Sequence, residues 1–423
     1  MKEFFRKTIL VFQDRILRRR IAFTLLGLVI FRVLSSIPIP SVDALRLQSF
    51  FSNNEFLGLL NLFSGGGLSN LSLVMLGVGP YINASIIMQL LTIMFPKLKA
   101  LYQEEGEAGR KKFSQYSRML TVPLALLQSF GFLKLLESNG VITHLTSFDF
   151  LINVMVVTAG SLLLMWIGEL ITEFGIGNGI SLIIFGGIVA SIPSLIGQLI
   201  FTFEISQLPL YLVLFAFAIF VIAGVVIITE AERPVPITYA KRIRGNKVYG
   251  GLSTYLPLRL NQAGVIPIIF ALSFLLFPQL IAQFLTQVDS EILRSIASSV
   301  VSLLNNTWLH ASLYFLLVFA FTYFYTALTF DPFSIATNLQ KNGAFIPGVR
   351  PGTSTADHLA RILTRLTLVG ALFLGFIAVL PSIIQATTGV ASLTIGGTAL
   401  LIAVSVIIDL IKKIDSQVSI REY

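Results

Sequence analysis

Cysteine and charge are what this sequence most clearly lacks. None of its 423 residues is cysteine, which excludes disulfides, thiolate metal sites and thiol nucleophiles. Charged residues make up only 12% of the chain, against roughly 25% in soluble domains, so the chain cannot cover an ordinary water-facing surface. The three histidines are isolated and form no HxxxH-type pair of metal ligands; they are His144, His310 and His358.

Long apolar runs are what the chain has instead. Apolar residues make up 55% of it and its mean hydropathy is +0.84, which indicates an integral membrane protein. About 20 apolar residues cross a bilayer. Ten such segments occur, at residues 21–37, 74–95, 118–136, 150–171, 180–203, 208–229, 263–284, 309–330, 363–384 and 393–411.

The first apolar run resembles a secretory signal, because Arg18, Arg19 and Arg20 precede it. It ends in the prolines Pro38 and Pro40 without a cleavage site of small residues, so we predict that it is retained as a span.

Lysine and arginine are unevenly distributed along the chain. Basic loops stay in the cytoplasm, and with a cytoplasmic N-terminus the cytoplasmic segments hold or border 26 of the 30 Lys and Arg residues. The exceptions are Arg46, Lys134 and Arg294 outside and Arg32 within the first span. We therefore predict that both termini are cytoplasmic. The net charge of +9 follows from this topology, and the basic face can also attract anionic lipid, acidic protein or ribosomal RNA.

The ten spans divide into two halves of five, residues 1–205 and 206–423. Five is odd, so the second half would be inverted relative to the first if the halves are repeats. Inverted repeats bind the transported species at their interface, and interrupted segments in matching positions mark the pathway.

Interrupted segments occur at the second position of each half. Residues 58–73 are apolar and uncharged, but Gly65, Gly66 and Gly67 divide them, which predicts a re-entrant half-helix rather than a span. Pro80 lies in the following span, and the matching span of the second half contains prolines too, each of which permits a kink. These positions favour a transport pathway, although Gly and Pro are common in membrane helices generally.

Embedded charge is scarce. Arg32 is the only plainly embedded charge, whereas a proton- or ion-coupled carrier usually retains several. Asn83, Gln89 and Gln128 are uncharged polar residues inside predicted spans. Such side chains either line a water-filled path or hydrogen-bond to neighbouring helices, and their spacing leaves both alternatives open.

Two predicted cytoplasmic loops, residues 230–262 and 331–360, are basic and also contain sequence patterns typical of defined turns. In the first, Gly245-Asn246 separates two β-prone runs and predicts a hairpin with a basic tip, which includes Lys241, Arg242 and Arg244. In the second, prolines and glycines place Arg350 on a stiff turn. Two such loops on one face indicate a docking platform; the alternative is that both are solvated loops that satisfy the topology rule.

Several long stretches, in the same order, resemble the SecY family of bacterial and plastid protein-translocation channels, homologous to the alpha subunit of the archaeal and eukaryotic translocon. The resemblance covers essentially the whole chain. The stretches are LNLFSGGGLSNLSLVMLGVGPYINASIIMQLL (61–91), EGEAGRKKFSQYSRMLT (105–121), GIGNGISLIIFGGIVA (175–190), ITYAKR (237–242), NQAGVIPIIFA (261–271), NGAFIPGVRPG (342–352), TRLTLVGA (364–371) and GGTALLI (396–402).

The resemblance implies an all-α membrane protein of ten transmembrane helices, in two inverted five-helix halves that form a clamshell around an hourglass pore. A lateral opening to lipid would lie between the second and third spans and the seventh and eighth spans, with Asn83 and Gln128 at polar gate positions. The implied plug covers about residues 61–72, including Phe63, Ser64, Gly65, Gly66, Gly67 and Leu68. The implied pore ring consists of Val78, Ile82, Ile180, Ile184, Ile269 and Ile402.

The resemblance also implies the function and the partners. The chain would conduct unfolded preproteins across the plasma (inner) membrane and release transmembrane segments laterally into the lipid bilayer. It would use no cofactor and be no enzyme, and no Gly-rich motif ending in GK[ST] is present to bind a nucleotide. SecE and SecG would be its membrane partners, and Arg350 would help to dock the SecA motor or the ribosome, with signal peptides entering at the gate. The rival class is a small-solute secondary transporter, which is also built on inverted repeats.

Overall fold

The structure is a computed structural model that describes residues 14–39, 61, 64, 66–68, 70–138, 140–142, 146–201, 208–240, 242–244, 247–249, 253–285, 291–304, 306–388 and 396–422. It is mostly helical and divides into two compact units. Unit 1 consists of Met1–Leu208, Ser273–Asn306 and Thr388–Tyr423. Unit 2 consists of Pro209–Leu272 and Thr307–Thr387.

Unit 1 is built from helices. They are α2 (Arg15–Ser35), α5 (Gly79–Met94), α6 (Pro96–Gln103), α7 (Gly106–Ser138), α8 (Ser147–Phe174), α9 (Gly179–Phe201), α12 (Glu291–Leu304) and α16 (Gly396–Glu422). Polar caps and prolines fix several starts. The Asp14 carboxylate accepts a hydrogen bond from the Ile16 amide at the start of α2, at 2.8 Å, and Thr146 caps α8 in the same way. Pro96 starts α6, where a proline loses no helix hydrogen bond.

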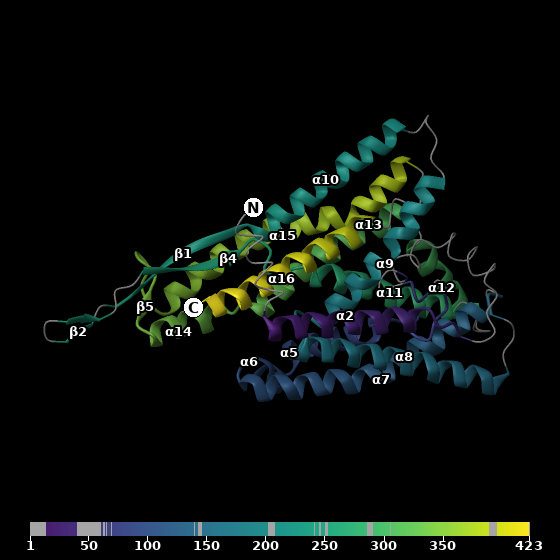
Figure 1. Ribbon diagram of the computed structural model, residues 1–423, viewed down its shortest axis with the longest axis horizontal. Helices are drawn as coiled ribbons and strands as arrows, with labels where there is room; N and C mark the ends of the chain where they lie inside the picture. Colours follow the sequence, from purple (N-terminus) through teal and green to yellow (C-terminus); the bar gives the residue numbers. More distant parts are fainter. Residues whose placement is uncertain are drawn as a thin grey trace. The chain divides into compact units, whose positions relative to one another are not determined.

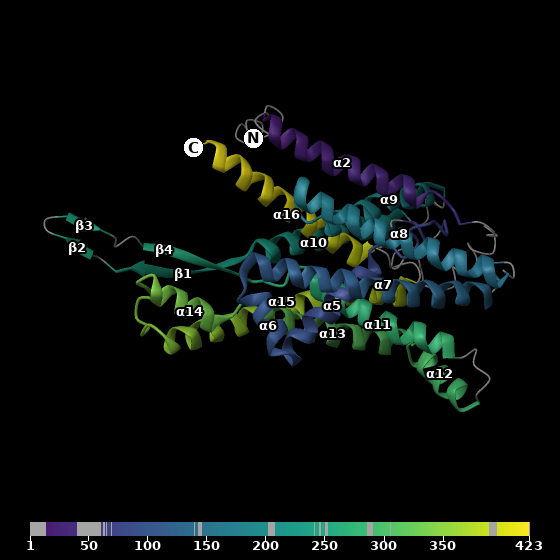
Figure 2. The same cartoon turned by 90° about the horizontal axis from the view of Figure 1, so that it is seen from below.

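The helices of unit 1 pack closely. Helix α7 lies against α5 and α8, while α9 lies against α8 and α16; Figures 1 and 2 show α7 and α8 side by side. Glycines permit the closest approach, since a Cβ on Gly179 of α9 would overlap the carbonyl of Gly168 on α8. A buried apolar cluster joins α7 and α8 to the segment that precedes α5.

Unit 2 combines apolar helices with a small sheet. The helices are α10 (Leu208–Glu230), α13 (Thr307–Thr329), α14 (Pro332–Lys341), α15 (Thr353–Thr388) and the first part of α11 (Ile266–Leu285). Strands β4 (Ser253–Arg259), β1 (Glu232–Tyr239) and β5 (Ala344–Phe345) form an antiparallel sheet in that order. Val235, Leu258 and Ile346 from the three strand regions pack with Leu359 and Ile362 of α15, so the loops are anchored on a long helix.

The predicted hairpin is confirmed, and the sheet beside it was not predicted. Strands β2 (Arg242–Arg244) and β3 (Lys247–Tyr249) pair antiparallel on either side of Gly245-Asn246, with Arg244 opposite Lys247; Figure 2 shows them beyond the ribbon of β1 and β4. The first β-prone run, from Pro234, covers much of β1, but the pairing of β1 with β4 was not predicted. Pro234 faces Pro257 in that register, and proline argues against a strand.

A helix occupies each of the ten predicted spans. Within the described part of the chain, four helical stretches are long and apolar enough to cross a membrane. They are Gly106–Glu137, Ser147–Phe174, Trp308–Lys341 and Thr353–Ile384. The pair Gly79–Met94 and Pro96–Tyr102, bent by 118°, adds a fifth if it is one span, and three shorter apolar helices lie at Gly179–Pro193, Phe215–Glu230 and Ile266–Leu275.

Candidate gate and docking loop

The segment expected to be the plug is attached to the end of the first helix. We use "plug segment" for its described residues, Ser64, 66–68 and 70–73. The Ile39 amide donates to the Leu71 carbonyl at 2.8 Å, and the Leu73 amide donates to the Ile37 carbonyl at 3.0 Å. Together with the bridge between Pro38 and Ser72, these bonds hold the end of the plug segment against the chain that leaves α2.

The plug segment is built from turns. The Ser64 hydroxyl donates to the Asn61 carbonyl and accepts from the Leu68 amide, both at 3.0 Å. Gly66 has a φ of +80°, which a residue with a Cβ adopts only at a cost. We expected a half-helix here, and the described residues from Ser64 to Val78 form turns instead, while Asn61 is helical. Phe63 and Gly65 lie outside the described residues.

Apolar side chains seat the plug segment in unit 1. Leu68 and Leu71 are fully buried and belong to one cluster with α7 and α8. The helix residues in this cluster are Phe132, Leu133, Leu136, Val154 and Val157. On α8, a Cβ at Gly160 would overlap the Leu73 carbonyl. The segment is therefore held by side-chain burial, by backbone hydrogen bonds and by a close fit against one glycine.

Leu71 has an unusual backbone within this seat. Its φ is +40°, and among the described residues it is the one non-glycine residue with a positive φ. A leucine in that region costs about 1–3 kcal/mol and persists only where its surroundings hold it. The buried cluster and the hydrogen bond from Ile39 supply that hold.

Five of the six residues expected to form the pore ring belong to unit 1, and Ile269 belongs to unit 2. Val78 precedes α5 and is buried, and Ile82 follows one turn later and is half-buried. Ile184 on α9 and Ile402 on α16 are buried on helices that pack together. Ile180 is half-buried with its Cδ1 beside Gly168 of α8, and Ile269 is half-buried on α11.

The polar positions expected at the lateral gate lie on two packed helices. Asn83 on α5 and Gln128 on α7 are both half-buried. Sequence reasoning missed the neighbouring ion pair, in which Arg118 of α7 contacts Glu169 of α8. Its signal was opposite charge near the predicted cytoplasmic ends of two spans, but no spacing rule relates residues on different helices.

The loop that carries Arg350 is held at both ends. Upstream, Ala344 and Phe345 pair with β1 and Ile346 is buried. Downstream, the Thr355 hydroxyl donates to the Arg350 carbonyl at 2.9 Å. Gly348 and Gly352 have φ values of +82° and +100°, so the turn needs glycine there. Arg350 itself is exposed, as a docking residue must be.

The second basic loop is described in part. Arg242 and Arg244 lie on β2 of the hairpin, and Lys241 lies outside the described residues.

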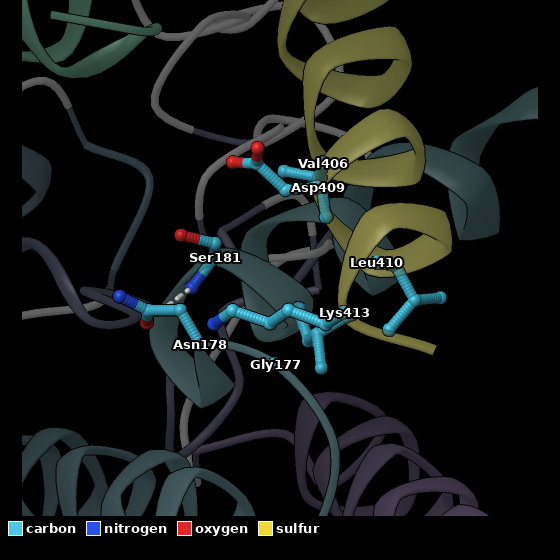
Figure 3. Close-up of a pocket in the computed structure, with 8 residues that line it drawn as sticks. Gly177, Asn178, Ser181, Val406, Asp409, Leu410 and Lys413 are labelled. Carbon is cyan, nitrogen blue, oxygen red and sulfur yellow. Dashed lines mark hydrogen bonds between the residues drawn. The ribbon is translucent and has the colours of Figure 1, made fainter. Parts of the chain in front are cut away.

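A small pocket of about 40 Å³ lies between the start of α9 and α16. The Asn178 side chain caps α9, because its Oδ1 accepts from the amides of Ile180 and Ser181 at 3.1 and 3.3 Å. Asp409 and Lys413, one turn apart on α16, also line the pocket (Figure 3). No group of three or more His, Asp or Glu residues within the described part of the chain is placed to hold a metal ion.

Comparisons with known proteins match one family over most of the chain. The SecY family profile matches residues 72–411. A Mycobacterium bovis protein named protein translocase subunit SecY is 42% identical over 438 aligned residues, which cover 96% of each chain. A Synechocystis protein of the same name is 42% identical over 418 residues, with 96% of this chain and 93% of the relative covered.

Solved structures share the fold. A protein-conducting channel is similar at a TM-score of 0.64 and 20% identity, with 94% of this chain and 92% of that one covered. Sec61 in the canine ribosome-channel complex from the endoplasmic reticulum is similar at a TM-score of 0.61 and 19% identity, with the same coverage. Because the profile spans most of the residues and the curated relatives match almost the full length, this chain belongs to the SecY family.

Proposed function

We propose that this chain is the pore-forming subunit of a protein translocase and conducts unfolded polypeptides across a membrane without chemistry of its own. Family membership supports the activity, since the relatives are named translocase subunits and a structural neighbour is a protein-conducting channel. The single observation that carries the gate is the seat of the plug segment, where Leu68 and Leu71 are buried between α7 and α8 just before Val78.

Aliphatic side chains suit such a gate. A narrow hydrophobic waist expels water, and an ion cannot keep its hydration shell there. Flexible side chains such as those of Ile82, Ile184 and Ile402 still part around a polypeptide of any sequence. A ring of charges or carbonyl groups would instead select one solute.

The finer architecture is part of the proposal. Ten helices cross the membrane in two inverted sets of five, residues 1–205 and 206–423, and both termini lie in the cytoplasm of a plasma membrane. The plug closes the pore from within the first set. Asn83 and Gln128 face the lateral exit for signal peptides and transmembrane segments, a position supported by their half-buried state on α5 and α7.

The partners follow from the two cytoplasmic loops. The exposed Arg350 and the hairpin of β2 and β3 form a basic surface that docks the SecA motor or the ribosome. A structural neighbour bound to a ribosome supports the second, while SecE and SecG complete the membrane complex. The motor or the ribosome supplies the energy for transport.

Crosslinking tests the proposal directly. Because the chain has no cysteine, Ile82→Cys and Ile402→Cys each provide a single thiol for a probe, in proteoliposomes with a stalled secretory precursor. Both probes should crosslink to the precursor, and a probe at Phe220→Cys, an exposed position on α10, should not. Equal labelling at all three positions, or none at Ile82 and Ile402, would reject the pore. Ion-coupled uptake of a small solute would favour the secondary transporter.

A further inference from the structure

Helix α12 lies where the sequence predicted only an outer loop between two spans. It covers Glu291–Leu304, with the sequence EILRSIASSVVSLL. Its apolar residues Ile292, Ile296 and Leu303 follow at spacings of four and seven, which places them on one side of the helix. Ser295 and Ser302 are on the other side, so the helix is amphipathic.

The apolar side of α12 is only partly covered. Ile292, Ile296 and Leu303 are 75%, 58% and 51% exposed, whereas Ala297 is buried at the other edge of the apolar face. Burial of an aliphatic side chain of this size in an apolar environment is favoured over its exposure to water. Three such side chains along one side of the helix therefore favour an apolar environment over water.

The serine side of α12 needs no protein partner. The hydroxyls of Ser298 and Ser299 both donate to the Ser295 carbonyl at 2.9 Å, and the Ser302 hydroxyl donates to the Ser299 carbonyl at 2.9 Å. The hydroxyl donors of these three serines are therefore satisfied within the helix, including that of Ser299, which borders the apolar stripe three residues after Ile296 and four before Leu303. Such a face is stable in water.

The chain on either side of α12 leads into the membrane. Helix α11 ends at Leu285, six residues before Glu291, and exposes apolar Ile281 near that end. Trp308, four residues after Leu304, is exposed, and tryptophan is enriched where a span meets the membrane surface. The nearest apolar environment for the stripe is therefore the lipid boundary.

We propose that α12 lies flat in the membrane–water interface, with Ile292, Ile296 and Leu303 among the lipid acyl chains and the serines toward water. Amphipathic helices bind in this way through their buried apolar area, and anionic lipid adds to it in proportion to their basic charge. Arg294 is the one basic residue of α12, so this contact depends little on anionic lipid. The helix thereby fixes the membrane depth at which α11 ends.

Fluorescence quenching tests the placement in the intact protein in proteoliposomes. Six single-cysteine variants carry an environment-sensitive dye: Ile292→Cys, Ile296→Cys and Leu303→Cys on the stripe, and Ser295→Cys, Ser298→Cys and Ser302→Cys on the serine side. A nitroxide attached near the headgroup end of a lipid chain should quench the first three at least severalfold more than the second three. Aqueous iodide should show the opposite order, in neutral and in anionic vesicles alike.

Each alternative has its own signature. Equal iodide quenching at all six positions would show that α12 is a loop helix in water and overturn the proposal. Protection of the stripe from both quenchers would show that a protein covers it and overturn the proposal as well. Precursor transport, measured on the same variants without dye, tests the channel separately from the position of α12.

Discussion

The Nε of Arg118 on α7 lies 2.6 Å from the Oε1 of Glu169 on α8. Helix α5, whose Tyr81 lies between Val78 and Ile82 in the sequence, packs against both α7 and α8. The ion pair therefore joins two of the three helices that meet next to the proposed pore ring. We expect the three helices to move together when the channel opens.

Removal of the ion pair should have a modest effect on stability. The two side chains are 46% and 19% exposed, so solvent screening limits the pair to about 0.2–1 kcal/mol. Arg118→Gln, Glu169→Gln and the double variant form a cycle that isolates this coupling in the free energy of unfolding. The charge swap Arg118→Glu with Glu169→Arg should recover part of it. A coupling of zero, with no recovery by the swap, would show that the pair does not stabilise the α7–α8 contact.

Glycine and alanine substitutions should raise the ion leak in a different order at Leu71 than at Leu68. Both substitutions remove a buried leucine, which costs about 2–5 kcal/mol, so each should unseat the plug segment and raise the resting ion leak of vesicles. At Leu71, whose φ is +40°, Leu71→Gly should leak less than Leu71→Ala, because glycine relieves about 1 kcal/mol or more of backbone strain.

Leu68 is the matched control, because it is equally buried in the same cluster and has no positive φ. There Leu68→Ala should leak no more than Leu68→Gly, since glycine has the greater entropy to lose. The same ranking at both positions would contradict a strained backbone at Leu71.

Gly160 should tolerate no side chain. A Cβ there meets the Leu73 carbonyl, which is backbone and moves only with the plug segment. Gly160→Ala should therefore raise the ion leak while α8 remains folded, since alanine favours a helix by about 1 kcal/mol over glycine. Gly131→Ala on α7, where nothing lies within 4 Å of the added Cβ, provides the control. Identical leak in the two variants would place the plug segment away from Gly160.

Ile402→Asn distinguishes a pore residue from a core residue. Ile402 is 2% exposed. If it faces a closed pore, the amide gains water when the pore wets, so ion leak rises and precursors with weak signal sequences are admitted. If it lies in the core, the unpaired amide costs about 1–3 kcal/mol of stability without a leak, and the proposed ring is wrong there. Ile407→Asn, at an exposed position on the same helix, should not raise the ion leak.

Arg350→Glu should impair transport driven by SecA. An arginine on a rigid turn presents a planar fork of donors to a carboxylate or phosphate, and loss of one such contact weakens binding by about tenfold to a hundredfold. Transport into proteoliposomes should fall by at least that factor, while membrane insertion and the ion seal stay intact. Lys341→Glu, at an exposed residue on α14, should have little effect. Equal defects in both variants would reduce Arg350 to a topology charge.

The sequence predicts the parts of this fold that depend on local pattern. Apolar runs located a helix at each predicted span, and Gly245-Asn246 located the hairpin of β2 and β3. Helix α12 was not predicted, because it contains too few apolar residues to form a membrane span. The pairing of β1 with β4 was not predicted, because both strands contain prolines and proline argues against a paired strand. Strand β5 pairs only with Thr238 and Tyr239 of β1, so the prolines of β1 need no hydrogen-bond partner on that side.

The contacts of the candidate gate and docking loop could be predicted only in part, because most of them join residues far apart in the sequence. Arg350 could be placed on a turn because Pro and Gly act locally. The Arg118–Glu169 pair spans 51 residues, and the positive φ of Leu71 is maintained by Ile39, which follows α2, and by residues of α7 and α8. Such features arise from tertiary packing, which no spacing rule along one chain encodes.

The length of α15 has a mechanical consequence. Its 36 residues make a rod about 54 Å long, whereas the hydrocarbon layer is about 30 Å thick. The helix begins at Thr353, directly after the loop that carries Arg350. Leu359 and Ile362, in its first turns, pack against the three-stranded sheet. A displacement of that loop would therefore be transmitted along α15 into the bilayer as far as Pro381, the proline inside the helix, where the helix can bend.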